Sequence, residues 1–360
     1  MIAVVHTLVA AMASEAANAN DTAKPPALVC APCWICLEDG PDDNGEPLVR
    51  DCSCRGETSA GYHVSCIIDY AKGKTNEAID LREKKQKVVE AVYEPWKFCP
   101  NCKQPYMSII SLQLAEAWLE HTNHLPESHY VRFRARCFHL ATLLLRAPIS
   151  KDYQTIEIQA KALLQTLEES SSELAVSLLG GKSAGDQHIE AVVAREKVNL
   201  LAKLGTAKQY MGNFESAMVL FESALEYLDV AEASGHYFVD QVQRESIEGS
   251  LRDIKREMGL ISPSEEVAEL RKSLNQLVQK KEGEFSITHA KFLLACALKE
   301  TDPPQYFEAV KLMKEASTVL TQMLGPEHKV VQIVKETYDM TRKEYKLYLQ
   351  AIAKKGNEKS

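Results

Sequence analysis

Eight thiol and imidazole groups between residues 33 and 102 constrain the fold of this chain more than any other feature. They form two C-x-x-C pairs, one C-x-C pair and one H-x-x-C pair. They are Cys33, Cys36, Cys52, Cys54, His63, Cys66, Cys99 and Cys102. Zinc takes four such ligands in a tetrahedron, and a C-x-x-C turn supplies two of them from one rigid loop. Eight ligands therefore predict two closed zinc sites. Closed sites have no open position for water, so we expect both ions to be structural.

The residues within and around these pairs carry a family resemblance. Cys-Trp-Ile-Cys at 33–36, Cys-Ser-Cys-Arg-Gly at 52–56 and Cys-Pro-Asn-Cys at 99–102 resemble a RING-CH (RING-variant) domain. An ordinary RING domain has histidine as its fourth ligand, whereas here cysteine is fourth and histidine fifth. A PHD finger shares this order but is less similar in its spacings. The resemblance implies interleaved sites, with Cys33, Cys36, His63 and Cys66 on one zinc ion and Cys52, Cys54, Cys99 and Cys102 on the other.

Two features depart from the simplest form of this pattern. Cys30 precedes Cys33 by the same spacing, so Cys30 and Cys33 are an alternative first ligand pair. The Trp-Ile filling typical of the family favours Cys33 with Cys36. Residues 67–98 are longer than the family usually allows between the sixth and seventh ligands, and we expect them to prolong a helix that begins after Cys66 or to loop outward. Loop closure costs little more as a loop lengthens, so such an insertion is compatible with closed zinc sites.

Composition and charge exclude several classes of protein. The chain has 360 residues and a formal net charge of −8, whereas a nucleic-acid partner would require a concentrated basic face. No apolar run reaches the roughly eighteen residues that a membrane span needs. Residues 1–13 resemble a short signal core, but no Lys or Arg precedes it, so we interpret them as a tail. Ten cysteines, eight of them in metal spacing, indicate a reducing compartment, which predicts a cytoplasmic or nuclear protein.

The pattern of the chain predicts four parts. They are a linker tail over residues 1–28, a small α+β zinc domain over 29–108, an all-α array over 109–353 and a charged tail over 354–360. Within the array a 3.6-residue period predicts successive helices. We expect one of them to stop before Pro148, a flexible joint over 170–185, and a last helix over about 330–353.

Part of the array resembles a tetratricopeptide (TPR) repeat, in which small residues let two antiparallel helices approach and aromatic residues fill the gap. The positions that match are Leu204, Gly205, Gly212, Phe214, Ala217, Phe221 and Ala224. Asp229 stands where the repeat usually has proline. A weaker match over 288–324 ends in Leu-Gly-Pro-Glu-His, which resembles the repeats of kinesin light chains. The alternative is a plain helical bundle whose apolar residues form only a core.

The resemblances together imply a ubiquitin ligase of the RING type. Such a domain docks a ubiquitin-conjugating enzyme and catalyses by positioning, without covalent chemistry. The docking residues implied are Ile35, Leu37, Tyr70, Pro100 and Lys103, with Tyr70 in place of the more usual tryptophan. The TPR-like array would hold the protein substrate or a peptide of it. The alternative is a zinc-stabilised adaptor that binds proteins with both parts and transfers nothing.

Overall fold

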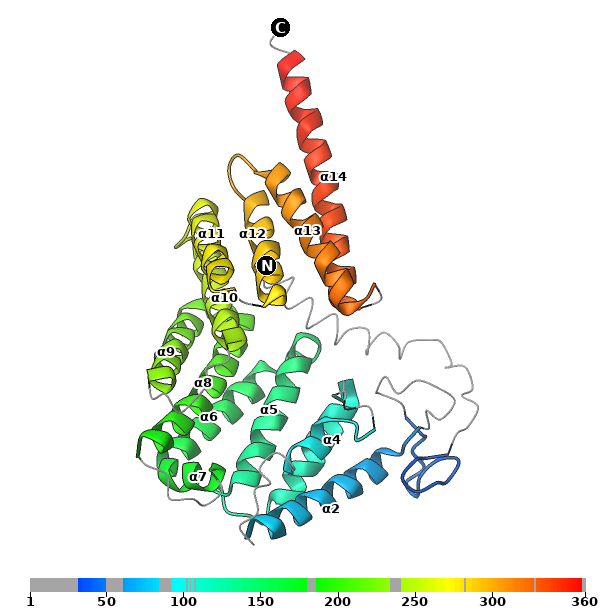
Figure 1. Ribbon diagram of the computed structural model, residues 1–360. Coiled ribbons are helices and arrows are strands. Elements are labelled where there is room, and N and C mark those ends of the chain that lie inside the picture. The colour runs from blue at the N-terminus through cyan, green and yellow to red at the C-terminus, as the bar shows by residue number, and fades with distance from the viewer. Residues whose placement is uncertain are drawn as a thin grey trace. The chain divides into compact units, whose positions relative to one another are not determined.

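The computed structural model describes residues 32–49, 61–83, 92–101, 103, 105–106, 108–179, 186–233, 241–281, 283–326 and 328–357. Most of these residues are helical (Figure 1). The helices are α2 (Val64–Glu83), α3 (Glu94–Lys97), α4 (Ser108–Thr122), α5 (Tyr130–Ser150), α6 (Tyr153–Glu169), α7 (Ser171–Leu178), α8 (Asp186–Tyr210), α9 (Phe214–Ala233), α10 (Gln241–Glu257), α11 (Pro263–Gln279), α12 (Glu284–Lys299), α13 (Tyr306–Leu324) and α14 (Lys329–Asn357).

The β structure of the zinc domain is slight within the described residues. It consists of two isolated antiparallel bridges, Val49 with Tyr62 and Phe98 with Pro105. Each bridge lies beside a cysteine or histidine of the predicted ligand set. The α+β character that the sequence predicts is therefore limited, in this part of the chain, to pairings of single residues.

The described chain divides into two compact units at Ile247, within α10. Each unit has its own hydrophobic core, one extending from Cys33 to Ala207 and the other from Val267 to Val334. The first core contains residues of the predicted zinc domain and of helices α4 to α8 alike. The zinc domain and the first helices of the array are thus one packed body.

The junction between these two parts is aromatic. The Trp96 ring from α3 stacks on the Trp118 ring from α4, with centroids 5.6 Å apart, and Phe138 from α5 lies 5.9 Å beyond Trp118. The Trp96 Nε1–H donates a 2.8 Å hydrogen bond to Thr75 Oγ1 on α2. Both tryptophans are fully buried. Trp96 packs in the core, where it contacts both α2 and α4.

Helix α2 accounts for the first part of the long 67–98 segment. Ile67, Ala71, Thr75 and Ala78 are buried, and their spacing of three to four residues places them on one helix face. That face packs against α4. The helix thus continues as far as Glu83, and the chain does not loop outward before that residue. Residues 84–91 lie outside the described part of the chain.

Three expectations for the helical array differ from the structure, namely two helix ends and the first part of the joint over 170–185. Helix α5 continues through Pro148 to Ser150 and ends at Lys151, whose left-handed backbone (φ 59°) lets its N–H bond to Ala147. Proline in a last turn removes only one helical hydrogen bond, so the helix tolerates it. Residues 171–178 form α7 because Leu174, Ala175 and Leu178 are buried on one face. Helix α14 continues to Asn357, beyond the expected end at 353 and into the predicted charged tail.

Helices α8 and α9 form a closely packed pair joined by a three-residue turn. Gly212 in the turn has φ +75°, a conformation that favours glycine. A Cβ atom on Gly205 would lie 3.1 Å from the ring of Phe221, and Ala207, Ala217 and Ala224 are fully buried. Small residues thus face an aromatic ring, as the TPR resemblance implies, and the helical structure is consistent with that resemblance.

The second unit is built from α11 to α14 and the end of α10. Ser262 and Glu265 form a capping box at the start of α11: each side chain accepts a hydrogen bond from the other residue's backbone N–H. Ala295, Ala309 and Ala316 are buried where α12 packs on α13. Cys296 is also buried, and burial raises the pKa of its thiol to about 12, as befits a core cysteine.

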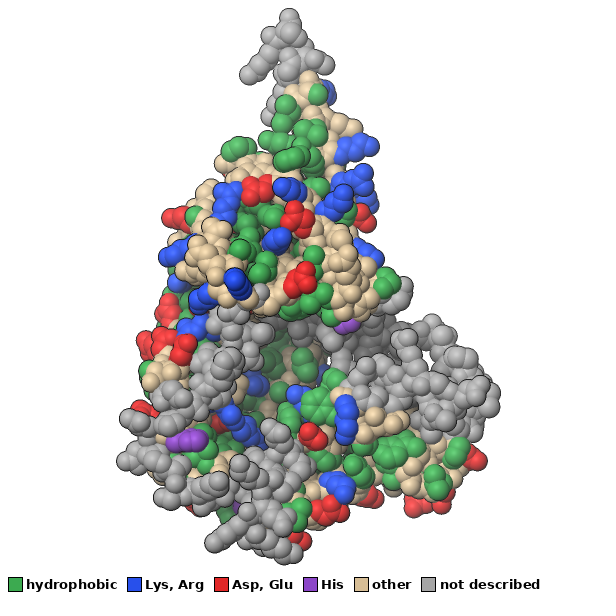
Figure 2. Space-filling view, in the orientation of Figure 1, with side chains coloured by type: hydrophobic (Ala, Val, Ile, Leu, Met, Phe, Trp, Pro, Cys, Tyr) green, Lys and Arg blue, Asp and Glu red, His purple; other side chains and the backbone are tan. Residues whose placement is uncertain are grey.

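The described surface carries acidic and basic side chains together. Figure 2 shows Lys and Arg side chains interspersed with Asp and Glu on the visible face. Hydrophobic side chains gather over the outer part of α14, where Leu347, Leu349 and Ile352 are exposed (Figure 2). Within the described residues, every helix is too short or too polar to cross a membrane.

Candidate metal centre

The first C-x-x-C pair lies on a tight turn closed by backbone hydrogen bonds. The Leu37 N–H donates to the Cys33 carbonyl oxygen at 2.7 Å, and the Cys33 N–H donates to the Glu38 carbonyl oxygen at 2.9 Å. Leu37 takes a left-handed conformation, with φ 64°, which turns the chain back after Cys36. The turn brings the two thiols to the same side. Cys33 is buried, whereas Cys36 is exposed.

His63 and Cys66 come from the start of α2. The bridge between Val49 and Tyr62, with N–H to O distances of 2.9 and 3.0 Å, fixes the chain directly before His63. Cys66 follows on the first turn of the helix, so that both side chains leave from one helix end. This places them over the Cys33–Cys36 turn. The four ligand atoms lie within 4.8 Å of one another.

The His63 ring is oriented for metal binding by a hydrogen bond on its far side. Its Nε2–H donates to the Gly40 carbonyl oxygen at 2.9 Å, which leaves the Nδ1 lone pair facing the thiols. Nδ1 lies 3.4 Å from Cys36 Sγ and 3.6 Å from Cys66 Sγ. A metal-binding histidine commonly has its other ring nitrogen fixed in this way.

These distances match the edges of a zinc tetrahedron. Zn–S bonds of about 2.3 Å and Zn–N bonds of about 2.0–2.1 Å, held at a tetrahedral angle, separate sulfur from nitrogen by about 3.5 Å. The two observed separations, 3.4 and 3.6 Å, bracket that value. Three thiols and one imidazole are also a donor set typical of structural zinc. The residues present therefore fit this metal.

The protonation of the thiols is set by burial and by the backbone. Burial acts to raise the pKa of Cys33, but hydrogen bonds from the backbone of Cys36, His63 and Ile35 outweigh it and bring this pKa to about 7. Burial raises the pKa of Cys66 to about 12. A metal ion would have to displace that proton, since only the thiolate is a ligand. Metal binding should therefore weaken as the pH falls.

Hydrogen bonds accepted by Asp42 hold the loop that carries Gly40. Asp42 accepts hydrogen bonds from the Ser65 hydroxyl at 2.6 Å and from the backbone N–H groups of Asn44 and Glu46. The Ser65 hydroxyl, first among these donors, holds the pKa of Asp42 below its ordinary value. The sequence shows this segment only as turn-forming residues. The role of Asp42 depends on the contact with α2 and could not be read from spacing.

The last C-x-x-C pair repeats the backbone geometry of the first. The Lys103 N–H donates to the Cys99 carbonyl oxygen at 2.8 Å, and Lys103 is left-handed with φ 59°. The bridge between Phe98 and Pro105 closes this turn. Cys99 is buried. Cys52, Cys54 and Cys102, which the resemblance assigns to the second zinc ion with Cys99, lie outside the described residues, as does Cys30.

A hollow lies beside the Cys99 turn. Its volume is ≈ 420 Å³, and the residues lining it are Tyr70, Glu94, Pro95, Phe98, Pro100 and Lys103. Three of the five predicted docking residues, Tyr70, Pro100 and Lys103, are thus brought to one place. The Tyr70 ring also meets the edge of Trp34, at 6.3 Å between centroids.

The other two predicted docking residues lie on the first turn. Leu37 is 73% exposed, and Ile35 is partly buried against the core. Glu94, Pro95 and Phe98 were missed by sequence reasoning, which treats residues 67–98 as an insertion. The only sequence feature that points to them is their proximity to Cys99.

Comparison with known families gives one match. Residues 33–80 match the family model of the RING-variant domain. Searches of curated proteins and of solved structures found no match to the chain. The match and the Cys/His cluster support a zinc-binding RING-variant domain, followed by a mostly helical region. A RING-variant domain suggests, in general terms, a role as a RING-type ubiquitin ligase.

Proposed function

We propose that this protein is a RING-type ubiquitin ligase whose zinc domain docks a ubiquitin-conjugating enzyme. The observation that carries the proposal is the hollow that joins Tyr70, Pro100 and Lys103 beside the Cys99 turn, with Tyr70 in turn contacting Trp34 of the Cys33 turn. Both turns end in an exposed, left-handed residue, Leu37 or Lys103. A domain held by metal ligands can present such residues to a partner because its own fold does not depend on burying them.

The chemistry of the hollow suits a protein loop with apolar anchors. Pro95, Phe98 and Pro100 supply apolar walls, while Glu94 and Lys103 place opposite charges at the rim. Apolar centres surrounded by polar rims are typical of protein interfaces. Leu37, which is 73% exposed, would extend the apolar contact. Lys103 would supply a cation between the conjugating enzyme and ubiquitin.

The second zinc ion of the proposal is held by Cys52, Cys54, Cys99 and Cys102. Cys99 is buried within a turn that has the same hydrogen bond as the Cys33 turn, which supports a role as ligand. Two structural ions would fix the Cys99 turn, which lines the hollow, and the Cys33 turn, whose Trp34 contacts Tyr70. Their contribution is to hold the docking surface, and the transfer itself needs no metal chemistry.

The helical array is proposed to hold the protein substrate. Its α8–α9 pair has the small-against-aromatic packing of a TPR unit, with Gly205 against Phe221. Stacked helix pairs of this kind expose concave surfaces that bind peptides or proteins. The zinc domain shares one core with α4 to α8, so the two bound partners would be held in a fixed relation. Fixed positioning is the means by which such a ligase acts.

A binding experiment tests the docking surface. The full chain is titrated with a panel of ubiquitin-conjugating enzymes, because a fragment ending near residue 108 would remove Trp118 from its stack with Trp96. Ile35→Ala and Lys103→Glu should each weaken binding by about tenfold, as interface anchors commonly do. Ile158→Ala, the same change at an exposed position of α6, should leave binding unchanged. Binding by none of the enzymes would favour the adaptor alternative.

A further inference from the structure

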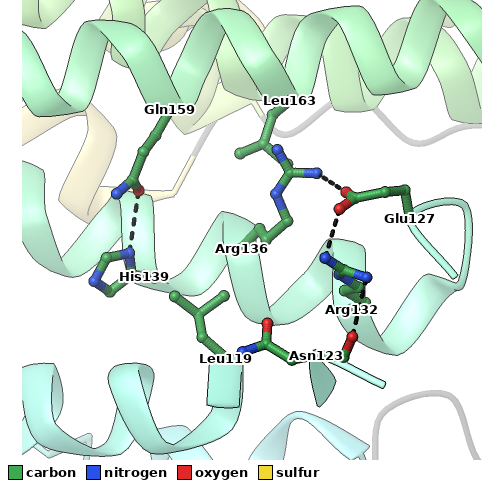
Figure 3. A pocket seen from close by; sticks show the side chains of 8 residues that line it. All are labelled: Leu119, Asn123, Glu127, Arg132, Arg136, His139, Gln159 and Leu163. Atoms are coloured by element: carbon green, nitrogen blue, oxygen red, sulfur yellow. Dashed lines mark hydrogen bonds and ion pairs between the residues drawn. The ribbon is translucent and has the colours of Figure 1, made fainter. Parts of the chain in front are cut away.

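A second hollow lies among the first helices of the array. It is a pocket of ≈ 350 Å³ between the end of α4, the loop that follows it, α5 and α6 (Figure 3). Arg132 and Arg136 enter it from successive turns of α5, and Glu127 enters from the loop. Leu119 and Leu163 give it an apolar wall. The pocket plays no part in the zinc domain or its docking surface.

The centre of this pocket already holds an oxyanion, the side chain of Glu127. Arg132 Nη2 lies 2.5 Å from Glu127 Oε1, and Arg136 Nη1 contacts Glu127 Oε2. One carboxylate is thus shared by two guanidinium groups (Figure 3). Guanidinium groups bind planar or tetrahedral oxyanions through paired hydrogen bonds. The chain's own carboxylate shows which kind of group the pocket accepts.

The arginines are fixed independently of Glu127, whereas Glu127 is free to leave. Arg132 Nη1 donates to the carbonyl oxygens of Leu125 at 2.6 Å and Asn123 at 3.2 Å. Arg136 Nη1 donates to Thr166 Oγ1 at 3.2 Å. Glu127 lies outside the helices and its side chain is 54% exposed. The arginine side chains are only 22% and 21% exposed, so Glu127 is the member of the cluster that a ligand can displace while both arginines stay in place.

The charge of the pocket selects the ligand. Two arginines and one glutamate leave a net positive charge. His139 does not add to it, because burial, the largest influence on its pKa, lowers that pKa; its Nδ1–H donates to Gln159 Oε1 at 3.1 Å. A ligand carboxylate would only replace Glu127, which competes at the high effective concentration of a tethered group. A phosphate monoester carries a charge of about −1.5 to −2 at pH 7 and three acceptor oxygens, so it can outcompete Glu127.

We propose that this pocket binds a phosphorylated side chain of a partner protein, with Glu127 displaced. The apolar wall beside the arginines suits the carbon atoms of such a residue, which a free phosphate ion lacks. A volume of ≈ 350 Å³ is at the small end for ligand sites and fits one side chain. The inference rests on the proposed ligase function only in making this partner a substrate. It would mean that phosphorylation selects what the array holds.

The test measures binding of the purified full chain to immobilised peptide libraries. The libraries are degenerate and share a central phosphoserine, phosphothreonine or phosphotyrosine; matched libraries carry the unmodified residue or glutamate there. We expect at least one phosphorylated library to bind about tenfold or more tightly than its glutamate counterpart, since a charge-assisted hydrogen bond gained is worth that factor. Soluble inorganic phosphate, tested as a competitor, distinguishes a site for free phosphate from one for a phosphopeptide.

Substitutions of residues that line the pocket test whether the phosphopeptide binds there. Arg136→Gln should weaken it about tenfold and Arg136→Lys by less, because lysine keeps the charge and loses the planar fork. Glu127→Gln should strengthen it several-fold by removing the competitor. Arg146→Gln, on the same helix but outside the pocket lining, is the matched control. Thermal unfolding of each variant establishes that it is folded.

Three results would overturn the inference, the first two being failures of peptide selectivity and of the variants. One is equal binding of the phosphorylated and glutamate libraries; the other is phosphopeptide binding that Arg136→Gln, Arg136→Lys and Glu127→Gln all leave unchanged. Full competition by inorganic phosphate, without any preference among libraries, would assign the pocket to the free ion and reject the peptide. The measurement uses no ubiquitin machinery, so its failure and the failure of the ligase proposal remain distinguishable.

Discussion

The zinc domain and the α8–α9 helix pair become ordered by different means. In the zinc domain short turns around a set of ligands hold the backbone, and helix α3 has only four residues. In the helix pair, Gly205 and three buried alanines admit the ring of Phe221. The Phe221 ring is therefore used internally, although Val219 and Val230 on the same helix are exposed. Leu37 of the zinc domain, at 73%, is more exposed than either, and this difference makes the zinc domain the better candidate for a docking surface.

The zinc domain and the array nevertheless share one core where Trp96 stacks on Trp118. Trp96 belongs to the zinc domain and Trp118 to the array, and the two rings are parallel within 5°. Thr75, which accepts the Trp96 N–H, is itself buried on α2. Loss of order in one part should therefore reach the other through this contact.

The largest effect should come from removing a metal ligand. Cys66→Ser should reduce the zinc content by about one ion per chain and unfold the first ligand turn, because structural zinc supplies about 10–16 kcal/mol in small zinc domains. Elemental analysis and Trp fluorescence measure the two effects. Cys137→Ser, at a cysteine that packs against the array core, should keep its zinc. Unchanged zinc in both proteins would show that Cys66 is not a ligand.

The aromatic junction should give the next largest effect. Trp118→Ala should destabilise the protein by about 3–5 kcal/mol, because it leaves a large cavity beside Trp96. In urea, zinc release should coincide with a loss of helical circular dichroism in the unchanged protein and separate from it in the variant. Because the second unit has its own core, it can add a further helical transition; only zinc release apart from every helical transition of the unchanged protein would mean that the zinc domain and the first helices of the array do not share one cooperative core.

The smallest effect should come from the helix pair. Gly205→Ala should lower the free energy of unfolding by about 1 kcal/mol, since the new Cβ would lie 3.1 Å from the buried Phe221 ring. Gly249→Ala is the matched control in α10, where the nearest atom is 3.8 Å away, at the end of Arg252. It should raise stability by about 0.5–1 kcal/mol because alanine favours helix more than glycine. Urea denaturation measures both changes, and equal stabilisation would refute the close packing.

Much of the site follows from spacing, because ligand chemistry is local. Cys33 and Cys36 are predicted from a C-x-x-C pair, and the pairing with His63 and Cys66 from the family resemblance. The bond from His63 to the Gly40 carbonyl oxygen could not be predicted, since it joins segments separated by 23 residues through a loop of irregular backbone.

The fold was harder to predict at its junctions than in its repeats. The small and aromatic positions of α8 and α9 follow a pattern that sequence shows directly. The Trp96–Trp118 stack does not, because each tryptophan alone is only a large apolar residue and their contact depends on how α2, α3 and α4 pack. The ends of α5 and α14 could not be predicted, because the helical backbone continues through Pro148 to Ser150 and through the charged residues after 353 to Asn357.

The most direct test of the proposed ligase is ubiquitin discharge from a charged conjugating enzyme onto free lysine. The full chain, loaded with zinc, should accelerate discharge from at least one enzyme of a panel. Ile35→Ala should reduce that acceleration by about tenfold or more, as for an interface anchor, while its zinc content and the activity of Ile158→Ala stay unchanged. No acceleration with any enzyme, or full activity of Ile35→Ala, would contradict the proposal.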